Sequence, residues 1–252
     1  MPYLDRDDVR LYFEDSGGEG PPILLSHGFG ASTDMWRGQV EAFSDRYRLI
    51  PWDMRGHGRT ECPDDPARFS QDETVEDMRA LLDHLGVEQA VIAGHSLGGF
   101  LSMAFHVRYP ERVRALVLQG CGPGFRSGGP RAVWNEYVEG RARSLEEGGL
   151  AVLGGGPEVD VSVQGSARGL ALAARGILSQ VDARVIDSLP AIAVPVLIVI
   201  GDGDSNYLQG SHYMAGRIPG AVNVVVPDAG HGVNVDQPAA VNEALGQFLA
   251  GL

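Results

Sequence analysis

The segment 94–99, which reads Gly-His-Ser-Leu-Gly-Gly, constrains the fold of this chain more than any other stretch. It follows a short apolar run at 90–93 and leads into a pattern typical of a helix over 98–109. A serine between a buried strand and a helix, with glycine two residues before and two after, fits a turn too tight for a Cβ at either glycine. We therefore expect Ser96 at positive φ with its hydroxyl above the sheet, and the amide of Leu97 directed towards the reacting atom.

Short apolar runs alternate with longer amphipathic stretches along most of the chain. The helical spacing of apolar residues predicts helices over 72–85, 98–109 and 236–249. Short apolar or β-branched runs predict strands at 9–13 (an edge strand), 23–26, 48–52, 90–93, 113–118, 194–200 and 222–226. This alternation predicts an α/β fold with a mostly parallel central sheet flanked by helices on both faces.

One region interrupts the alternation. Between residues 122 and 189 no buried strand is predicted, and the clearest patterns are helical, at 133–145 and 167–180. We expect a helical cap inserted over the carboxyl ends of the strands, the edge where ligands bind in open α/β sheets. A helical extension that touches no substrate is the alternative. The predicted division is a first core segment at 1–121, the cap at 122–189 and a second core segment at 190–252.

Composition excludes several classes of function. A net charge of −13 disfavours nucleic acid and anionic membranes as partners and leaves a small-molecule substrate open. The two cysteines, Cys62 and Cys121, give neither a disulfide framework nor a zinc spacing, and the histidines have no metal-ligand spacing, so no metal or organic cofactor is expected. The first residues lack a signal-peptide pattern, and we expect a cytoplasmic protein without a membrane span. The oligomeric state is not indicated.

A serine hydroxyl needs a base, and the chain offers one at another predicted strand end. His231 follows the last predicted strand, whereas His27, His57 and His95 are more simply interpreted as packed residues that shape their loops. A carboxylate must then orient the imidazole. Two carboxylates compete in the segment Gly-Asp-Gly-Asp at 201–204, namely Asp202 and Asp204. Asp204 is favoured because it lies further along the loop, and Asp202 is expected to brace the turn.

The order Ser96, Asp204, His231 is the order of the α/β-hydrolases, and the chain resembles that superfamily in its group with a helical cap. The likeness covers about 20–120 and 189–252 and also rests on the segments 27–30, 53–58, 109–113 and 229–231. By this resemblance the amides of Phe29 and Leu97 would form an oxyanion hole. The resemblance also implies structural roles for Asp53 and Arg55.

The implied chemistry is acyl transfer, and the predicted function is a serine hydrolase that cleaves small carboxylic esters through an acyl-enzyme intermediate. A carbon–carbon bond hydrolase or an enol-lactone hydrolase would share the same three residues. A perhydrolase resembling haloperoxidases is a further alternative, although that group usually carries proline where Gly30 stands. The last alternative is a small-molecule receptor with residual hydrolysis.

Aromatic residues near the predicted site indicate a pocket for an apolar or aromatic ester. The substrate-binding candidates are Trp36 after the oxyanion loop and, in the cap, Trp134 and Tyr137. The cap also carries arginines that either pair with a substrate carboxylate or form a solvated face, namely Arg126, Arg131 and Arg141.

Overall fold

The computed structural model describes residues 2–252 and contains two sheets. The main sheet has six parallel strands in the order β4-β3-β5-β6-β7-β8. Its strands are β3 (Pro22–Ser26), β4 (Arg48–Trp52), β5 (Ala90–His95), β6 (Val113–Gln119), β7 (Val196–Gly201) and β8 (Val222–Val226). The predicted parallel sheet is therefore confirmed, and the family resemblance to an α/β-hydrolase fold agrees with it.

The predicted edge strand at 9–13 is placed differently. β2 (Val9–Tyr12) pairs in antiparallel register with β1 (Tyr3–Arg6), which the sequence did not indicate, and the two form a separate small sheet. The link to the main sheet is an antiparallel bridge between Phe13 and Trp52 at the end of β4. The alternation in this segment identified a strand correctly, but it carried no information about which strand would be its partner.

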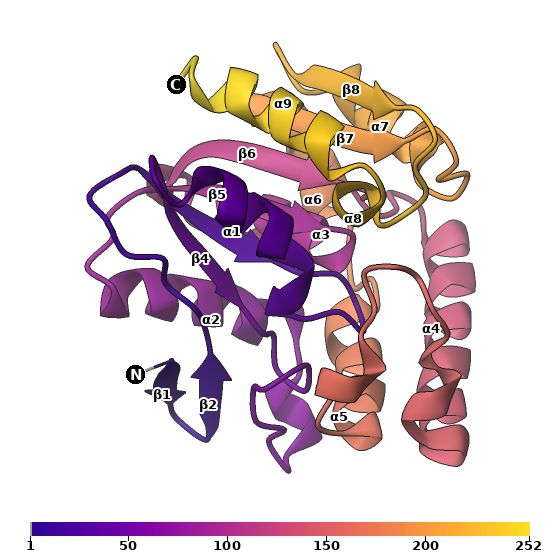
Figure 1. Cartoon of the computed structure of the whole chain (residues 1–252). Helices are drawn as coiled ribbons and strands as arrows, with labels where there is room; N and C mark the ends of the chain where they lie inside the picture. Colours follow the sequence, from indigo (N-terminus) through magenta and orange to yellow (C-terminus); the bar gives the residue numbers. More distant parts are fainter. Residues whose placement is uncertain (1) are drawn as a thin grey trace.

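Helices cover both faces of the main sheet, as Figure 1 shows. Alternate residues of the strands point to opposite faces: Leu24 and Ile92 belong to one hydrophobic cluster, and Ile23 and Val91 to the other. The first face is covered by α2 (Gln71–His84), α3 (Leu97–Arg108), α6 (Arg184–Ser188) and α7 (Leu208–Ala215). The second is covered by α1 (Arg37–Phe43), α8 (Val233–Asp236) and α9 (Pro238–Leu249). Burial on both faces explains why the strands are almost uniformly apolar.

The segment between β6 and β7 is helical throughout its regular parts. Its main elements are α4 (Gly128–Gly148), α5 (Ala167–Ala173) and a single π-helical turn over Ala174–Leu178. Within residues 2–252 no strand lies between Gln119 and Val196. α4 and α5 pack side by side beyond the carboxyl ends of the strands, and their buried side chains are continuous with the core. The domain boundaries at 121 and 189 stay a prediction.

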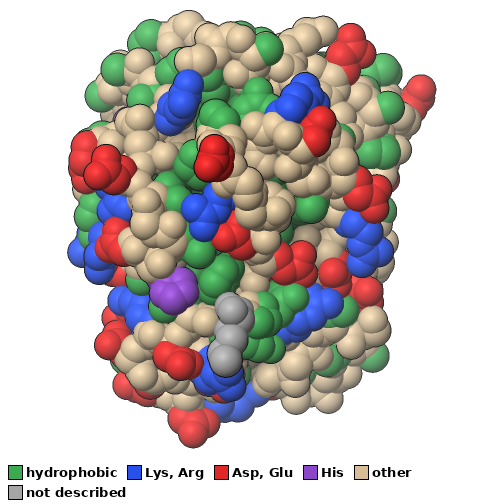
Figure 2. All heavy atoms as spheres, turned by 60° about the vertical axis from the view of Figure 1, so that its left-hand side comes forward, with side chains coloured by type: hydrophobic (Ala, Val, Ile, Leu, Met, Phe, Trp, Pro, Cys, Tyr) green, Lys and Arg blue, Asp and Glu red, His purple; other side chains and the backbone are tan. Residues whose placement is uncertain are grey.

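The face of the molecule drawn in Figure 2 gives no simple electrostatic signal. On the face drawn in Figure 2, acidic and basic side chains are interspersed, and neither sign gathers into a continuous patch. Among residues 2–252, no helix is both long enough and apolar enough to cross a membrane.

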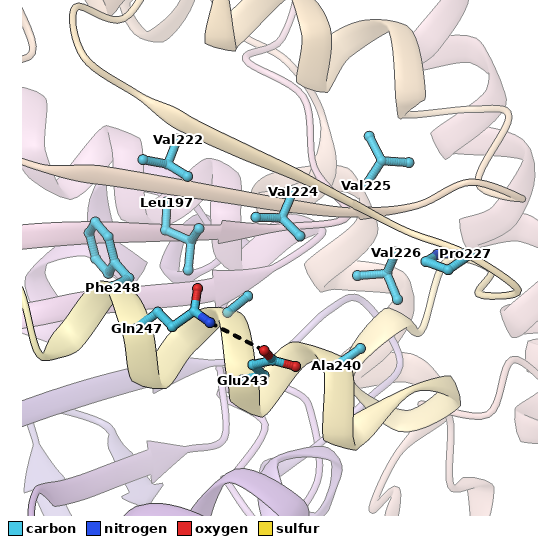
Figure 3. Close-up of a pocket in the computed structure, with 11 residues that line it drawn as sticks. Leu197, Val222, Val224, Val225, Val226, Pro227, Ala240, Glu243, Gln247 and Phe248 are labelled. Carbon is cyan, nitrogen blue, oxygen red and sulfur yellow. Dashed lines mark hydrogen bonds between the residues drawn. The ribbon is translucent and has the colours of Figure 1, made fainter.

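An open pocket of about 490 Å³ lies between β8 and α9, at the outer edge of the sheet (Figure 3). Valine side chains of β8 face Ala240 and Phe248 of α9 across it, and a hydrogen bond of 3.2 Å joins Gln247 to Glu243 on the helix. Neither Ser96 nor His231 lines this pocket. This pocket is therefore separate from the candidate site at the carboxyl ends of the strands.

Candidate active site

Ser96 occupies a strained turn between β5 and α3. Its φ is 52° and its ψ −114°, which confirms the predicted positive φ, a region that costs a residue with a side chain about 1–3 kcal/mol. A Cβ on Gly94 would lie 2.2 Å from the carbonyl of Gly98, and a Cβ on Gly98 would lie 2.2 Å from the carbonyl oxygen of Ser26. Glycine is therefore required on both sides of the serine.

Two backbone amides face the region of the serine. Leu97 is the first residue of α3, and an amide in the first turn of a helix has no partner within the helix. Phe29 lies in the loop after β3, and this loop approaches closely, since a Cβ on Gly28 would be 3.3 Å from the Cβ of Ser96. Among residues 2–252, neither amide donates to another protein group. Both amides are thus free to donate to a ligand, which makes them candidates for an oxyanion hole.

His231 and Asp204 form a hydrogen-bonded pair. The Nδ1 of His231 lies 2.7 Å from Oδ2 of Asp204, whose side chain is only 2% exposed. Asp202 is exposed, and its amide donates to the carbonyl of Val226 at 3.0 Å, which braces the turn. With Nδ1 donating to the carboxylate, Nε2 of His231 is left as a proton acceptor. The geometry favours Asp204 over Asp202.

Two further rings fix the orientation of the His231 imidazole. Tyr207 stacks on it with ring centroids 4.9 Å apart and planes 21° apart, and His95 approaches at 4.7 Å with a 56° tilt. The Nε2 of His95 donates to the backbone carbonyl of His231 at 2.7 Å. The imidazole is therefore held by a carboxylate, by two rings and through its own backbone.

Tyr207 also meets the nucleophile. Burial raises the pKa of Tyr207 to about 12, and the nearby Ser96 hydroxyl opposes that rise. Within residues 2–252 no hydrogen bond joins Ser96 to the imidazole of His231. Sequence reasoning missed Tyr207. Its one signal was its place three residues after Asp204 in the loop after β7.

The other histidines of these loops are neutral, buried residues. His27 links two loops, because its Nδ1 donates to the carbonyl of Gly28 at 2.7 Å and its Nε2 accepts from the amide of Met54 at 2.9 Å. Burial lowers the pKa of His27 to about 4, and that of His57 and of His95 to about 3. These contacts agree with the interpretation that they shape the loops.

Asp53 and Arg55 tie together the loops beneath the site. The carboxylate of Asp53 accepts from the amides of Thr33 at 2.6 Å and Arg59 at 2.8 Å. The guanidinium of Arg55 is fully buried and binds both carboxylate oxygens of Asp77, at 2.5 and 2.8 Å. Neither side chain is free to meet a substrate, which favours the structural roles implied by the resemblance.

Burial raises the pKa of Asp53 to about 6, and this shift predicts a pH dependence of stability. The pKa of Asp53 in the folded state lies above the unfolded value of about 3.9. The protonated carboxyl therefore stabilises the folded state in full below pH ~4, and this stabilisation is lost as pH rises through about 6. Relative to Asp53→Asn, the wild type should gain about 2 kcal/mol of unfolding free energy between pH 7 and 4. Urea denaturation at several pH values measures this difference. Parallel pH profiles for the two proteins would contradict it.

The three predicted substrate-binding aromatics have different surroundings. Trp36 is 0% exposed in the hydrophobic cluster beneath the sheet, because the 3₁₀ turn Thr33–Trp36 directs it inwards, and its assignment to the substrate pocket is corrected to a core role. Trp134 is half-buried, and its indole N–H donates to the carbonyl of Leu178 at 3.0 Å. Tyr137 is 53% exposed, with its ring 5.6 Å from that of Trp134. Only the two cap aromatics stay in the proposed pocket.

The cap contacts the loops that carry the candidate residues. Buried Gln164 donates to the carbonyls of Gly30 and Ala31, both at 3.1 Å, and accepts from the amide of Gly58 at 3.0 Å. A Cβ on Gly232, next to His231, would lie 2.7 Å from a carboxylate oxygen of Glu158. The segment between β6 and β7 therefore packs against the loops that carry the candidate residues. Within the described residues, no three or more histidine, cysteine, aspartate or glutamate side chains are grouped to hold a metal ion.

Comparison with known proteins agrees with the fold. The family model described as the alpha/beta hydrolase fold matches residues 21–153, more than half of the chain. The chain belongs to the α/β-hydrolase family. Relatives that match along nearly their whole length include an enol-lactonase and an esterase, and this supports hydrolase activity for the chain.

Three of these similar proteins illustrate the range. A Bacillus subtilis protein, provisionally named 2-succinyl-6-hydroxy-2,4-cyclohexadiene-1-carboxylate synthase, is 28% identical over 98% of this chain and 97% of its own. 3-Oxoadipate enol-lactonase 2 of Acinetobacter baylyi is 29% identical over 96% and 94%. A thermophilic esterase from Thermogutta terrifontis, solved with malate bound, has a TM-score of 0.81 at 28% identity, covering 96% and 94%.

Proposed function

We propose that this chain is a serine hydrolase that cleaves small carboxylic esters through an acyl-enzyme intermediate. The observation that carries the proposal is the 2.7 Å hydrogen bond between Asp204 and His231 on loops adjoining the strained turn of Ser96. A carboxylate-oriented imidazole beside a serine at a strand-to-helix turn is the arrangement that activates a hydroxyl for attack on a carbonyl carbon. Similarity to an esterase supports the ester class.

The reaction proceeds in two halves. The Ser96 hydroxyl turns towards His231, passes its proton to Nε2 and bonds to the carbonyl carbon. The amides of Phe29 and Leu97 donate to the oxygen that gains negative charge, and each such donor contributes about 3 kcal/mol of transition-state stabilisation. His231 then gives its proton to the departing alcohol, which leaves an acyl-Ser96. In the second half water replaces the hydroxyl as nucleophile, and the acid is released.

The cap supports a preference for small substrates. Gln164 binds the carbonyl of Gly30, and a Cβ on Gly30 would lie 3.0 Å from the side chain of Leu153, so the cap closes tightly over the oxyanion loop. The partly buried Trp134 and the exposed Tyr137 supply an apolar and aromatic lining at its edge. An enol-lactone is a cyclic ester, and the similarity to an enol-lactonase makes it the second candidate substrate class.

A series of 4-nitrophenyl esters from acetate to laurate tests this proposal. We expect a kcat of about 1–1000 s⁻¹ on the best ester. We expect kcat/KM to be highest at four carbons or fewer, and at least about 10-fold lower for laurate, because methylenes that do not fit the covered site are rejected. Negligible turnover of every ester by the folded protein would contradict ester hydrolysis and favour carbon–carbon bond cleavage or a receptor. A maximum at laurate would contradict the small pocket.

A further inference from the structure

One face of the cap helix α4 carries an arginine directed at the candidate oxyanion loop. Trp134, Tyr137 and Arg141 are spaced three and four residues apart, so they share a side of the helix. The guanidinium carbon of Arg141 lies 5.3 Å from the ring centre of Phe29 and 6.0 Å from that of Tyr137. Phe29 supplies one of the two candidate oxyanion amides. A cation is therefore placed beside the site by a helix of the cap.

Most cap arginines other than Arg141 are paired with a carboxylate; within residues 2–252 Arg131 also lacks such a partner, but it makes no cation–π contact. Arg126 binds Asp187 at 2.6 Å, Arg143 binds Glu139 at 3.0 Å, and Arg175 binds the same glutamate at 2.8 Å. Within residues 2–252, no carboxylate oxygen lies within 4.0 Å of Arg141, and its one side-chain partner is the neutral hydroxyl of Tyr137 at 3.2 Å. In a chain with a net charge of −13, this leaves a half-buried guanidinium without a counter-ion beside the candidate site.

We propose that Arg141 binds a carboxylate on the substrate and makes this site selective for esters that carry an anionic end. The inference rests on the proposed function and adds the substrate class to it. A guanidinium has five N–H donors in a planar fork that matches a carboxylate, and only one of those of Arg141 has a protein partner. The ring of Phe29 holds the fork in place by a cation–π contact. Anchoring the far end of the substrate would set its ester carbonyl against the amides of Phe29 and Leu97.

Matched pairs of esters test this assignment, with hydrolysis followed by pH-stat. Monoethyl succinate, glutarate and adipate are compared with ethyl butyrate, valerate and hexanoate, each pair differing by a carboxylate in place of a terminal methyl. A fourth pair, butyryl glycolate and ethyl butyrate, places the carboxylate on the alcohol side of the ester. We expect the wild type to favour the anionic member of at least one pair by about 10- to 100-fold in kcat/KM, mainly through KM, as for one charge-assisted contact.

Arg141→Gln should abolish this preference and leave kcat/KM for the neutral esters within about 2-fold, because the substitution leaves Ser96 and its partners in place. Arg141→Lys keeps the charge without the fork, and its preference should be intermediate. Arg143→Gln is the matched control, since Arg143 lies on the same helix, is 67% exposed and is paired with Glu139. It should behave as the wild type. Raising the salt concentration should weaken the anionic preference of the wild type, of Arg143→Gln and of Arg141→Lys, whereas Arg141→Gln should have no preference to weaken.

The results separate this inference from the proposed function. If neutral esters are hydrolysed but no anionic member is preferred, or if Arg141→Gln lowers both members of each pair equally, the role of Arg141 is wrong and the hydrolase assignment stands. If no ester of either kind is turned over, the proposed function fails first. Thermal unfolding of each variant, compared with the wild type, establishes that Arg141→Gln is folded. Should it not fold, the loss of preference in Arg141→Lys and its salt dependence decide the question.

Discussion

Replacing Ser96 with alanine is expected to lower kcat for the best ester by about 10⁴- to 10⁶-fold, with little change in stability. The substitution removes the oxygen that would form the acyl-enzyme and leaves the oxyanion amides in place, because those belong to the backbone. Alanine keeps the same Cβ at the same strained φ of 52°, so the turn should be retained. Steady-state kinetics with 4-nitrophenyl butyrate measure the loss.

Ser102→Ala is the matched control for this experiment. Ser102 lies on the same helix, α3, is fully buried, and its hydroxyl donates to the carbonyl of Gly98 at 2.8 Å. Its loss should cost about 1 kcal/mol of stability and leave turnover within about 2-fold of the wild type. If Ser96→Ala retains more than about a tenth of the wild-type kcat, the assignment of the nucleophile is wrong.

Asp204→Asn should lower kcat by about 10⁴-fold, whereas Asp202→Asn should change it by less than about 3-fold. An asparagine amide at 204 can donate to Nδ1 of His231, which favours the tautomer with the proton on Nε2 and removes the base facing Ser96. The Asp202 side chain is exposed, and the contact of this residue with Val226 is made by its backbone amide. The same kinetic assay on both variants ranks them. The reverse ranking would transfer the acid role to Asp202.

The features that could be predicted best from the sequence are those that depend on neighbouring residues and on local backbone conformation. Ser96 could be predicted at positive φ because two flanking glycines leave few other structures for the turn, and the central strands could be predicted because they are buried on both faces. The start of the last helix was less accurate: the helix predicted at 236–249 begins at Pro238 in the structure, where proline takes the first helical position, and the short helix α8 precedes it.

The rest depended on contacts between distant segments. Trp36 follows the oxyanion loop in sequence, but only the direction of its 3₁₀ turn places it in the core. Tyr207 stacks on His231, 24 positions later in the chain, and no local pattern in the sequence indicates that contact. For Arg141 the sequence left two alternatives, a substrate partner and a solvated face. The cation–π contact with Phe29, more than a hundred residues earlier, favours the first.

The central claim is that Ser96 is the nucleophile, and mass spectrometry after treatment with diethyl 4-nitrophenyl phosphate tests it most directly. A serine activated by His231 displaces nitrophenolate and keeps the diethylphosphoryl group. We expect one such group per chain, on the peptide that contains Ser96, and none on the Ser96→Ala variant. A folded wild-type protein that stays unlabelled, or that is labelled on a different residue, would contradict the account.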